Sequence, residues 1–186
     1  MALQVRGMAL ATTRAYAKEA FEKSGWEGLI AELPAADAKV WETLILPTGW
    51  YPIELFHNFL RALDRRNRAR VPDLGHQLGR RIARGNIKFF LSLVVPLLSP
   101  LTVLSQASPL WKEYFSAGAM HVVDEGHHAV KITLDNPGVD RIVCGEIVVG
   151  WGVQAVEETR AKVVRAEQVH CVHEGFSRCE YVVTWR

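Results

Sequence analysis

The stretch CVHEGFSRCEYVVTW, residues 171–185, predicts a β-hairpin. Gly175 is its natural turn residue, because glycine reaches the positive φ angles that tight turns require. With the turn centred there, Cys171 falls opposite Cys179. Directly opposed residues share one face of a hairpin. Both thiols are therefore expected to point the same way.

The same register predicts which other side chains share the cysteine face. It pairs Val169 with Tyr181, Glu167 with Val183 and Arg165 with Trp185. Most of these residues are apolar, so a helix should cover this face. Arg165 and Glu167 are expected on the same side, where they either pair at its rim or mark the opening of a pocket.

The preceding segment, residues 139–158, has the spacing of a helix that could supply this cover. Cys144, Val148, Trp151 and Ala155 recur at steps of three and four residues and form one face. If that face packs on the hairpin, the three cysteines converge. Three thiolates with a fourth nitrogen or oxygen ligand satisfy zinc, so Cys144, Cys171 and Cys179 are candidate zinc ligands. The alternative is that they are three ordinary buried cysteines.

Upstream of this helix, the apolar pattern predicts one more hairpin. Residues 120–124 and 128–135 alternate in the manner of strands, whereas helices are expected near 9–23 and 37–46, from 52, from 72, and over 109–117. Gly75 and Gly79 should allow another helix to approach closely, and Gly85 should end its helix. The predicted fold class is a two-layer α+β fold: N-terminal helices, then strand-strand-helix-strand-strand with a four-stranded antiparallel sheet.

The length of the chain, 186 residues, fits one domain. We expect an N-terminal helical extension over 1–50, a helical layer over 51–118 and a sheet-plus-helix core over 119–186.

The cellular context is predicted from the cysteines and the apolar segments. An odd count of three cysteines fits a reducing cytoplasm better than a disulfide framework. The N-terminus lacks the continuous apolar core of a signal peptide. Phe89–Leu104, the most apolar stretch, is interrupted by Pro96 and Pro100 and is too short to span a bilayer. We therefore expect a cytoplasmic protein without a transmembrane segment.

The net charge of +2 hides an uneven distribution. The segment Arg61–Lys88 contains nine basic residues against Asp64 and Asp73. No aromatic residues interleave with the cations, as a nucleic-acid surface would require. An acidic protein partner or an anionic membrane surface is favoured over nucleic acid.

Three stretches carry a family resemblance: CGEIVVGWG at 144–152, the strand 163–170, and the hairpin 171–185. Together they resemble the C-terminal core of 4-vinyl reductase domains. These share a superfamily with the sensor domains of aromatic-catabolism activators, heme nitric-oxide-binding domains and Bet3-like transport subunits. The resemblance implies an apolar ligand pocket between helices and sheet, and a homodimer.

The resemblance also bears on cofactors. In the aromatic-sensor branch, a zinc ion is held by three cysteines placed like those here and by a glutamate, where this chain has Gln168. The heme branch matches less well, because its Tyr-x-Ser-x-Arg motif is absent. The expectation is possible zinc and no heme.

The sequence carries no catalytic motif that we recognise: Gly-x-Ser-x-Gly, a phosphate loop and His-Glu-x-x-His are all missing. We therefore predict a non-catalytic regulatory or sensory module that binds a small apolar ligand. The candidate pocket residues are Phe89, Phe90, Leu93, Leu97, Trp111, Trp151 and Tyr181. The alternatives are a dimeric scaffold or assembly subunit that binds a protein partner, and an accessory factor for tetrapyrrole or aromatic metabolism.

Overall fold

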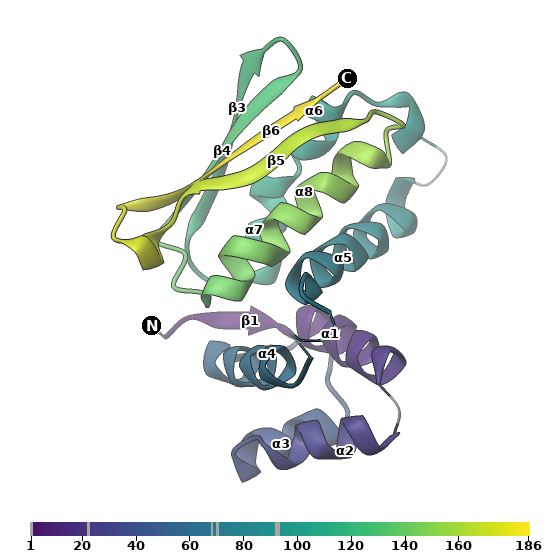
Figure 1. The fold of residues 1–186 in the computed structure, drawn as a ribbon, viewed down its shortest axis with the longest axis vertical. Helices are drawn as coiled ribbons and strands as arrows, with labels where there is room; N and C mark the ends of the chain where they lie inside the picture. Colours follow the sequence, from purple (N-terminus) through teal and green to yellow (C-terminus); the bar gives the residue numbers. More distant parts are fainter. Residues whose placement is uncertain (1, 22, 68, 70, 92–93) are drawn as a thin grey trace. The chain divides into compact units, whose positions relative to one another are not determined.

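A computed structural model describes residues 2–21, 23–67, 69, 71–91 and 94–186 of the chain (Figure 1). The chain divides into two compact units. The first unit comprises residues 1–74 and 114–116, and the second comprises residues 75–113 and 117–186. The prediction of one domain over 1–186 stays a prediction.

The first unit is mainly helical. Its elements are β1 (Gln4–Arg6), α1 (Gly7–Ala20), α2 (Lys23–Ala31), α3 (Ala35–Glu42), β2 (Trp50–Pro52) and α4 (Ile53–Asn67). The two short strands pair antiparallel, with Val5 opposite Tyr51. In the core, the fully buried rings of Trp41 and Phe59 stack with centroids 3.7 Å apart. This stack joins α3 to α4, which buries one apolar face.

The second unit contains the sheet and is α+β, as predicted. Its elements are α5 (Leu74–Leu91), η1 (Val95–Leu97), α6 (Pro100–Leu104), α7 (Ala107–Tyr114), β3 (Ala119–Gly126), β4 (Ala129–Asp135), the π-helical η2 (Ile142–Ile147), α8 (Val148–Glu157), β5 (Val163–His170), η3 (Val172–Glu174) and β6 (Arg178–Trp185). The four strands form one antiparallel sheet in the order β3-β4-β6-β5. The helix α8 lies along β5 and β6 (Figure 1).

The centre of the sheet is a ladder of apolar pairs. Alternate residues of β4 and β6 face each other and are buried: Val130 with Val183, Ile132 with Tyr181, and Leu134 with Cys179. Their period of two is the one that the sequence shows. This ladder fixes the face of β6 from which Cys179 projects.

The register of the last hairpin differs from the predicted one. Gln168 pairs with Tyr181, and Ala166 with Val183, whereas the prediction placed Val169 and Glu167 there. The register shift between Gln168 and His170 causes the difference, and a second shift follows between Val163 and Arg165. A bulge adds one unpaired residue and turns every side chain beyond it to the other face. Arg165 and Glu167 are consequently exposed, and they pair with each other.

Two glycines allow the backbones of α5 and the η2–α8 helix to touch. A Cβ atom on Gly79 would lie 2.1 Å from the carbonyl oxygen of Ile147. Reciprocally, a Cβ atom on Gly150 would lie 2.1 Å from the carbonyl oxygen of His76. The predicted close approach at Gly79 is thus confirmed. Gly85 does not end the helix, since α5 continues to Leu91.

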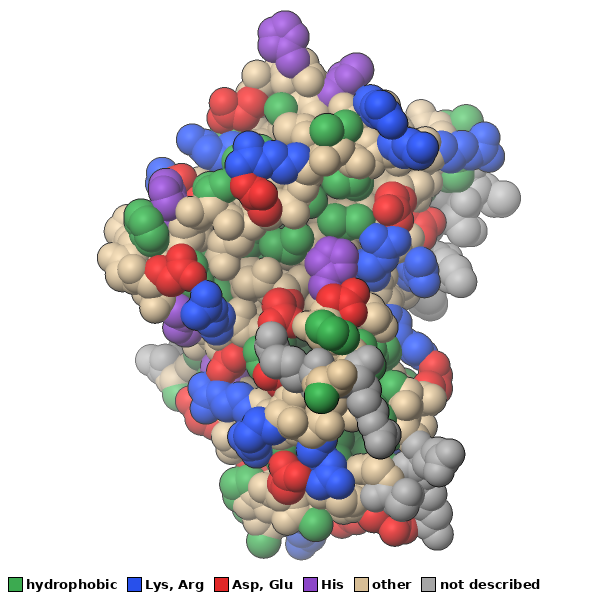
Figure 2. All heavy atoms as spheres, viewed as in Figure 1, with side chains coloured by type: hydrophobic (Ala, Val, Ile, Leu, Met, Phe, Trp, Pro, Cys, Tyr) green, Lys and Arg blue, Asp and Glu red, His purple; other side chains and the backbone are tan. Residues whose placement is uncertain are grey.

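The basic segment is partly neutralised by acidic residues within each unit. Arg66 lies 2.6 Å from Glu32 in the first unit, and Arg80 pairs with Glu157 in the second. Arg68 and Arg70 lie outside the described residues. On the face drawn in Figure 2, basic and acidic side chains are interspersed. Within the described part of the chain, every helix is too short or too polar to cross a bilayer.

Candidate functional site

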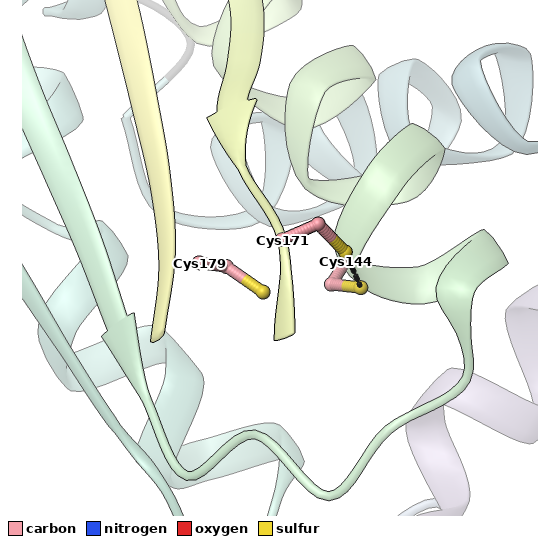
Figure 3. A group of neighbouring side chains, drawn as sticks. All are labelled: Cys144, Cys171 and Cys179. Atoms are coloured by element: carbon pink, nitrogen blue, oxygen red, sulfur yellow. Dashed lines mark hydrogen bonds between the residues drawn. The ribbon is translucent and has the colours of Figure 1, made fainter. Parts of the chain in front are cut away.

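The three cysteines of the chain meet in the second unit (Figure 3). Their sulfur atoms all lie within 4.8 Å of one another, and the Sγ atoms of Cys144 and Cys171 are 3.9 Å apart. Cys144, Cys171 and Cys179 are 0%, 1% and 0% exposed. The structure therefore brings together the three residues that the sequence singled out as candidate ligands.

Each cysteine is positioned by a different element. Cys144 lies in η2, where its Sγ is 3.7 Å from the carbonyl oxygen of Arg141. Cys171 caps the single turn η3, and Cys179 is held in β6 by its pairing with Leu134. Between the last two, Gly175 has a φ of 92°, the left-handed conformation that glycine tolerates. The expected turn residue is thus what lets the two cysteines face the same helix.

The π-helical form of η2 was not expected. The sequence predicted one continuous helix over 139–158, whereas six residues, Ile142–Ile147, have the wider π-helical turn. Such segments are rare and frequent at functional sites. Here the segment carries Cys144 at its centre.

Burial controls the protonation of the cluster. It raises the pKa of the Cys144 thiol, and the neighbouring thiols Cys179 and Cys171 raise that pKa further. Burial likewise raises the pKa of Cys179, and it raises the pKa of the Tyr181 phenol well above its ordinary value. A second negative charge close by would be unfavourable in such surroundings. In the metal-free cluster, burial therefore favours the neutral thiol form of Cys144 and Cys179.

The cluster has three donors. Among the described His, Cys, Asp and Glu side chains, Cys144, Cys171 and Cys179 form a group without a fourth member. The amide nitrogen of Gln168 donates to the Tyr181 hydroxyl at 3.4 Å. His170 lies 3.0 Å from Glu180, and His173 lies 3.0 Å from the carbonyl oxygen of Val139.

The predicted pocket residues lie in different surroundings of the second unit. Trp111 is buried in α7 and donates to the carbonyl oxygen of Ala117 at 3.0 Å. Tyr181 is buried, Trp151 is half-buried in α8, and Leu97 is 81% exposed. Leu93 and the side chains of Phe89 and Phe90 lie outside the described residues. The predicted pocket stays a prediction.

One contact in this unit was missed by the sequence analysis. A carboxylate oxygen of Glu146, in η2, accepts a hydrogen bond of 3.2 Å from the backbone N–H of Gly75. Gly75 is in the first turn of α5, where an acidic side chain is favourable. Sequence alone gave no signal for it, because the two residues are far apart in the chain.

Comparison with solved structures identifies the fold. An H-NOX protein variant from S. oneidensis in the Fe(II) ligation state matches with a TM-score of 0.75 and 12% sequence identity, covering 97% of this chain and 96% of the other. An H-NOX protein from K. algicida, in the unliganded Fe(II) state, matches with a TM-score of 0.72 and 9% identity over 97% and 96% of the two chains. The chain has the H-NOX fold. The sequence matches no protein-family model and no curated protein.

The H-NOX fold corrects the family resemblance. The sequence placed the chain with 4-vinyl reductase domains, aromatic-activator sensors and Bet3-like subunits, and this placement is wrong. The matching structures are H-NOX proteins over nearly their whole length. The resemblance rested on short C-terminal stretches that form one helix and one hairpin. Different folds share these two elements, so the stretches do not distinguish between them. The zinc that the aromatic-sensor branch implied loses its support at the same time.

The expectation of no heme is also corrected. It rested on one missing motif, whereas one matching structure was solved to probe heme distortion in the H-NOX family, with a TM-score of 0.71 and 10% identity over 97% and 95% of the two chains. The absence of a short motif is therefore no ground for excluding heme from a chain with this fold.

The described residues can be tested against heme, whose iron is bound by His, Cys, Met or Tyr side chains. In the second unit, His121, His127 and His128 lie on the exposed β3–β4 hairpin. The buried sulfur atoms lie against one another, and the Tyr181 hydroxyl accepts a hydrogen bond from Gln168. These donors of the second unit are either exposed or engaged with one another, and they do not form a heme-ligand set.

Proposed function

We propose that this chain is a non-enzymatic sensory module, which binds a small ligand and signals by a change in packing. The observation that carries the proposal is the H-NOX fold over 97% of the chain. Among the matching proteins, one from S. oneidensis was solved with Fe(II)NO, with a TM-score of 0.73 and 12% identity over 97% and 99% of the two chains. We extend a ligand-binding role to this chain only as a proposal, because fold alone does not determine function.

The buried polar groups support a binding role over catalysis. Several bind their own backbone: Thr13 donates to Ala9 at 2.8 Å, Asn67 to Leu63 at 2.7 Å and Thr159 to Val156 at 2.7 Å. Asp140 accepts the N–H of Ile142 at 3.0 Å, as a helix cap does. These groups satisfy local hydrogen bonds and therefore have structural roles.

The second unit also contains a route for a packing change. The backbones of α5 and η2–α8 touch at Gly79 and Gly150, and η2 carries the cysteine that contacts the hairpin. A shift of α5 cannot be absorbed by flexible side chains at these contacts. Such a shift would move α8 and the sheet as well. Ligand binding could in this way change the population of two conformations, and a partner protein could bind one of them selectively.

The proposal is tested with defined probes and the purified full chain. Hemin, protoporphyrin IX and p-cresol are each titrated, and binding is followed by native mass spectrometry and thermal unfolding. Saturable binding of one equivalent of any probe, with a raised Tm, supports the proposal. The absence of binding for all three, or conversion of a probe to a product of different mass, overturns it.

A further inference from the structure

The cysteine cluster has two properties that together select its ligand: three donors and no compensating charge. All three sulfur atoms come from separate segments and converge within 4.8 Å. Thiolates bind soft, thiophilic cations. Coordination number and charge distinguish among these cations at three buried sulfur atoms.

The coordination number is the first criterion. Structural zinc sites are four-coordinate, and the described residues bring no fourth His, Asp or Glu to the cluster. The nearby polar side chains also make other hydrogen bonds: the Gln168 amide nitrogen donates to the Tyr181 hydroxyl, and His173 Nε2 lies 3.0 Å from the carbonyl oxygen of Val139. The donor set is therefore suited to an ion that is complete with three sulfur ligands.

Charge is the second criterion. Three thiolates carry three negative charges, and the cysteines are at most 1% exposed. The guanidinium closest in sequence to Cys144, that of Arg141, lies at the surface 2.7 Å from Glu174. Burying a net charge without a partner is costly. The complex of three thiolates with a monovalent cation has a net charge of −2, and the complex with a divalent cation has a net charge of −1. Only a trivalent cation gives a neutral complex.

We infer that Cys144, Cys171 and Cys179 form a binding site for a trivalent metalloid, the class of arsenite and antimonite. Such a centre is pyramidal, with three ligands on one side and a lone pair on the other, so it needs no fourth donor. The inference concerns the second unit alone and holds whether or not the chain binds a further sensory ligand.

The binding step balances without an oxidant or a reductant. Arsenous acid, As(OH)3, condenses with the three thiols to give As(SR)3 and three water molecules. Three As–O and three S–H bonds break, while three As–S and three O–H bonds form. Arsenic stays trivalent, and each leaving hydroxide takes up one thiol proton.

Access to the buried sulfur atoms is provided by the turn between two of them. Residues 173–178, which link Cys171 to Cys179, are exposed, and Gly175 has open space around its α-carbon. Local opening of an exposed turn costs less than global unfolding. Binding is therefore expected to be slow, at the rate at which this turn opens.

Arsenite added to the reduced full chain tests the inference by native mass spectrometry. The expected product is one adduct that gains one arsenic atom and loses three hydrogen atoms, accompanied by loss of all three titratable thiols. No adduct, or an adduct that retains a free thiol, overturns the inference. Zinc ion that displaces bound arsenite at equal concentration also overturns it.

A matched reagent separates loss of the third ligand from loss of the fold. Monomethylarsonous acid forms two As–S bonds, so Cys179→Ala should still bind it through Cys144 and Cys171. The same variant should bind arsenite at least about a hundredfold more weakly, the lower end of the gain from an added intramolecular attachment. Equal arsenite affinity in Cys179→Ala and the unchanged chain contradicts a three-sulfur site. If Cys179→Ala binds neither reagent, Cys144→Ala is compared in the same way, and failure of both variants with folded circular dichroism spectra contradicts the site.

Discussion

Gly79 and Ile147 lie so close that a Cβ atom on the glycine would be 2.1 Å from the carbonyl oxygen of the isoleucine. The contact is between backbones, so no side chain can rotate away to make room. It joins α5 directly to the π-helical segment that carries Cys144. The position of the sulfur cluster therefore depends on a glycine that belongs to another helix.

Gly79→Ala should destabilise the chain by about 1–3 kcal/mol or more, the range for overpacking a core. Gly85, in the same helix, is the matched control because no other described side chain or packed backbone lies within 4 Å of its added Cβ. Gly85→Ala should stabilise by about 0.4–1 kcal/mol by restricting the unfolded chain. Urea unfolding measures both, and equal effects of the two substitutions would refute the contact.

The observed register of β5 predicts which of two neighbouring positions tolerates a change of charge. Ala166 pairs with Val183 on the face toward α8, whereas Arg165 is exposed. Ala166→Glu should cost about 1–3 kcal/mol, because it places a carboxylate on a half-buried apolar face. Arg165→Gln should cost less than about 1 kcal/mol, because it removes only an exposed ion pair. A larger loss of unfolding free energy for Arg165→Gln than for Ala166→Glu, measured by chemical denaturation, would instead support the register that the sequence predicted.

The stacked rings of Trp41 and Phe59 predict that two substitutions at Trp41 lower the stability of the chain by different amounts. Trp41→Ala should cost about 3–5 kcal/mol, as expected for removal of a fully buried aromatic ring. Trp41→Phe should cost much less, because it keeps a ring on Phe59 and removes an indole N–H that has no acceptor among the described residues.

Leu44→Ala is the control for this pair, since Leu44 is 78% exposed and a surface change is usually within about 0.5 kcal/mol. Equal losses for Trp41→Phe and Trp41→Ala would show that stacking contributes nothing at this site.

Glu180 predicts part of the acid sensitivity of the chain. Hydrogen bonds from His170 and then Arg178 lower the pKa of its carboxyl group below the ordinary value. The folded state therefore binds this proton less readily than the unfolded state. The stabilisation is complete above the ordinary carboxyl pKa of about 4.3, and it is lost as the pH falls through the lowered folded pKa.

Glu180→Gln should accordingly flatten the decline of the unfolding free energy below about pH 5. High salt should weaken the effect in the unchanged chain by screening the exposed partners. The measurement is urea unfolding at a series of acidic pH values. A decline in Glu180→Gln as steep as in the unchanged chain would assign the acid sensitivity to other groups.

Thiol reactivity tests the burial of the cluster. All three cysteines should react with Ellman's reagent at least about a hundredfold more slowly in the folded chain than in guanidinium, since reaction requires an opening that costs ~3 kcal/mol or more. Burial also raises the pKa of Cys144, so little reactive thiolate is present. A fast phase of one thiol per chain in native buffer would contradict the packing of that residue.

The sequence predicted the parts of the fold that depend on local periodicity. Alternation in residues 128–135 identified β4, and Gly175 identified the last turn. The pairing of His170 with Glu180, next to this turn, agrees with the predicted register. The cysteines lie beyond that pair, which is why their convergence could be anticipated from the turn alone.

Features without a local signal could not be predicted. The bulges in β5 change the register by one residue, and apolar alternation does not reveal an unpaired residue. The strands β1 and β2 are three residues each, too short for a periodic pattern. Gly85 was expected to end its helix, but a helical glycine costs only about 1 kcal/mol relative to alanine, and the buried Leu78 and Ile82 hold α5 in place before it.

The irregularities of β5 have a consequence for self-association. β5 is an edge of the four-stranded sheet, with unpaired backbone groups along one side. Its register is broken at both ends, and Arg165 and Glu167 carry charge on its exposed face. Bulges and edge charges are the means by which natural sheets resist the addition of a foreign strand. The β5 edge is thereby protected against amyloid-like stacking, a useful property for a strand that ends beside a cluster of reactive sulfur atoms.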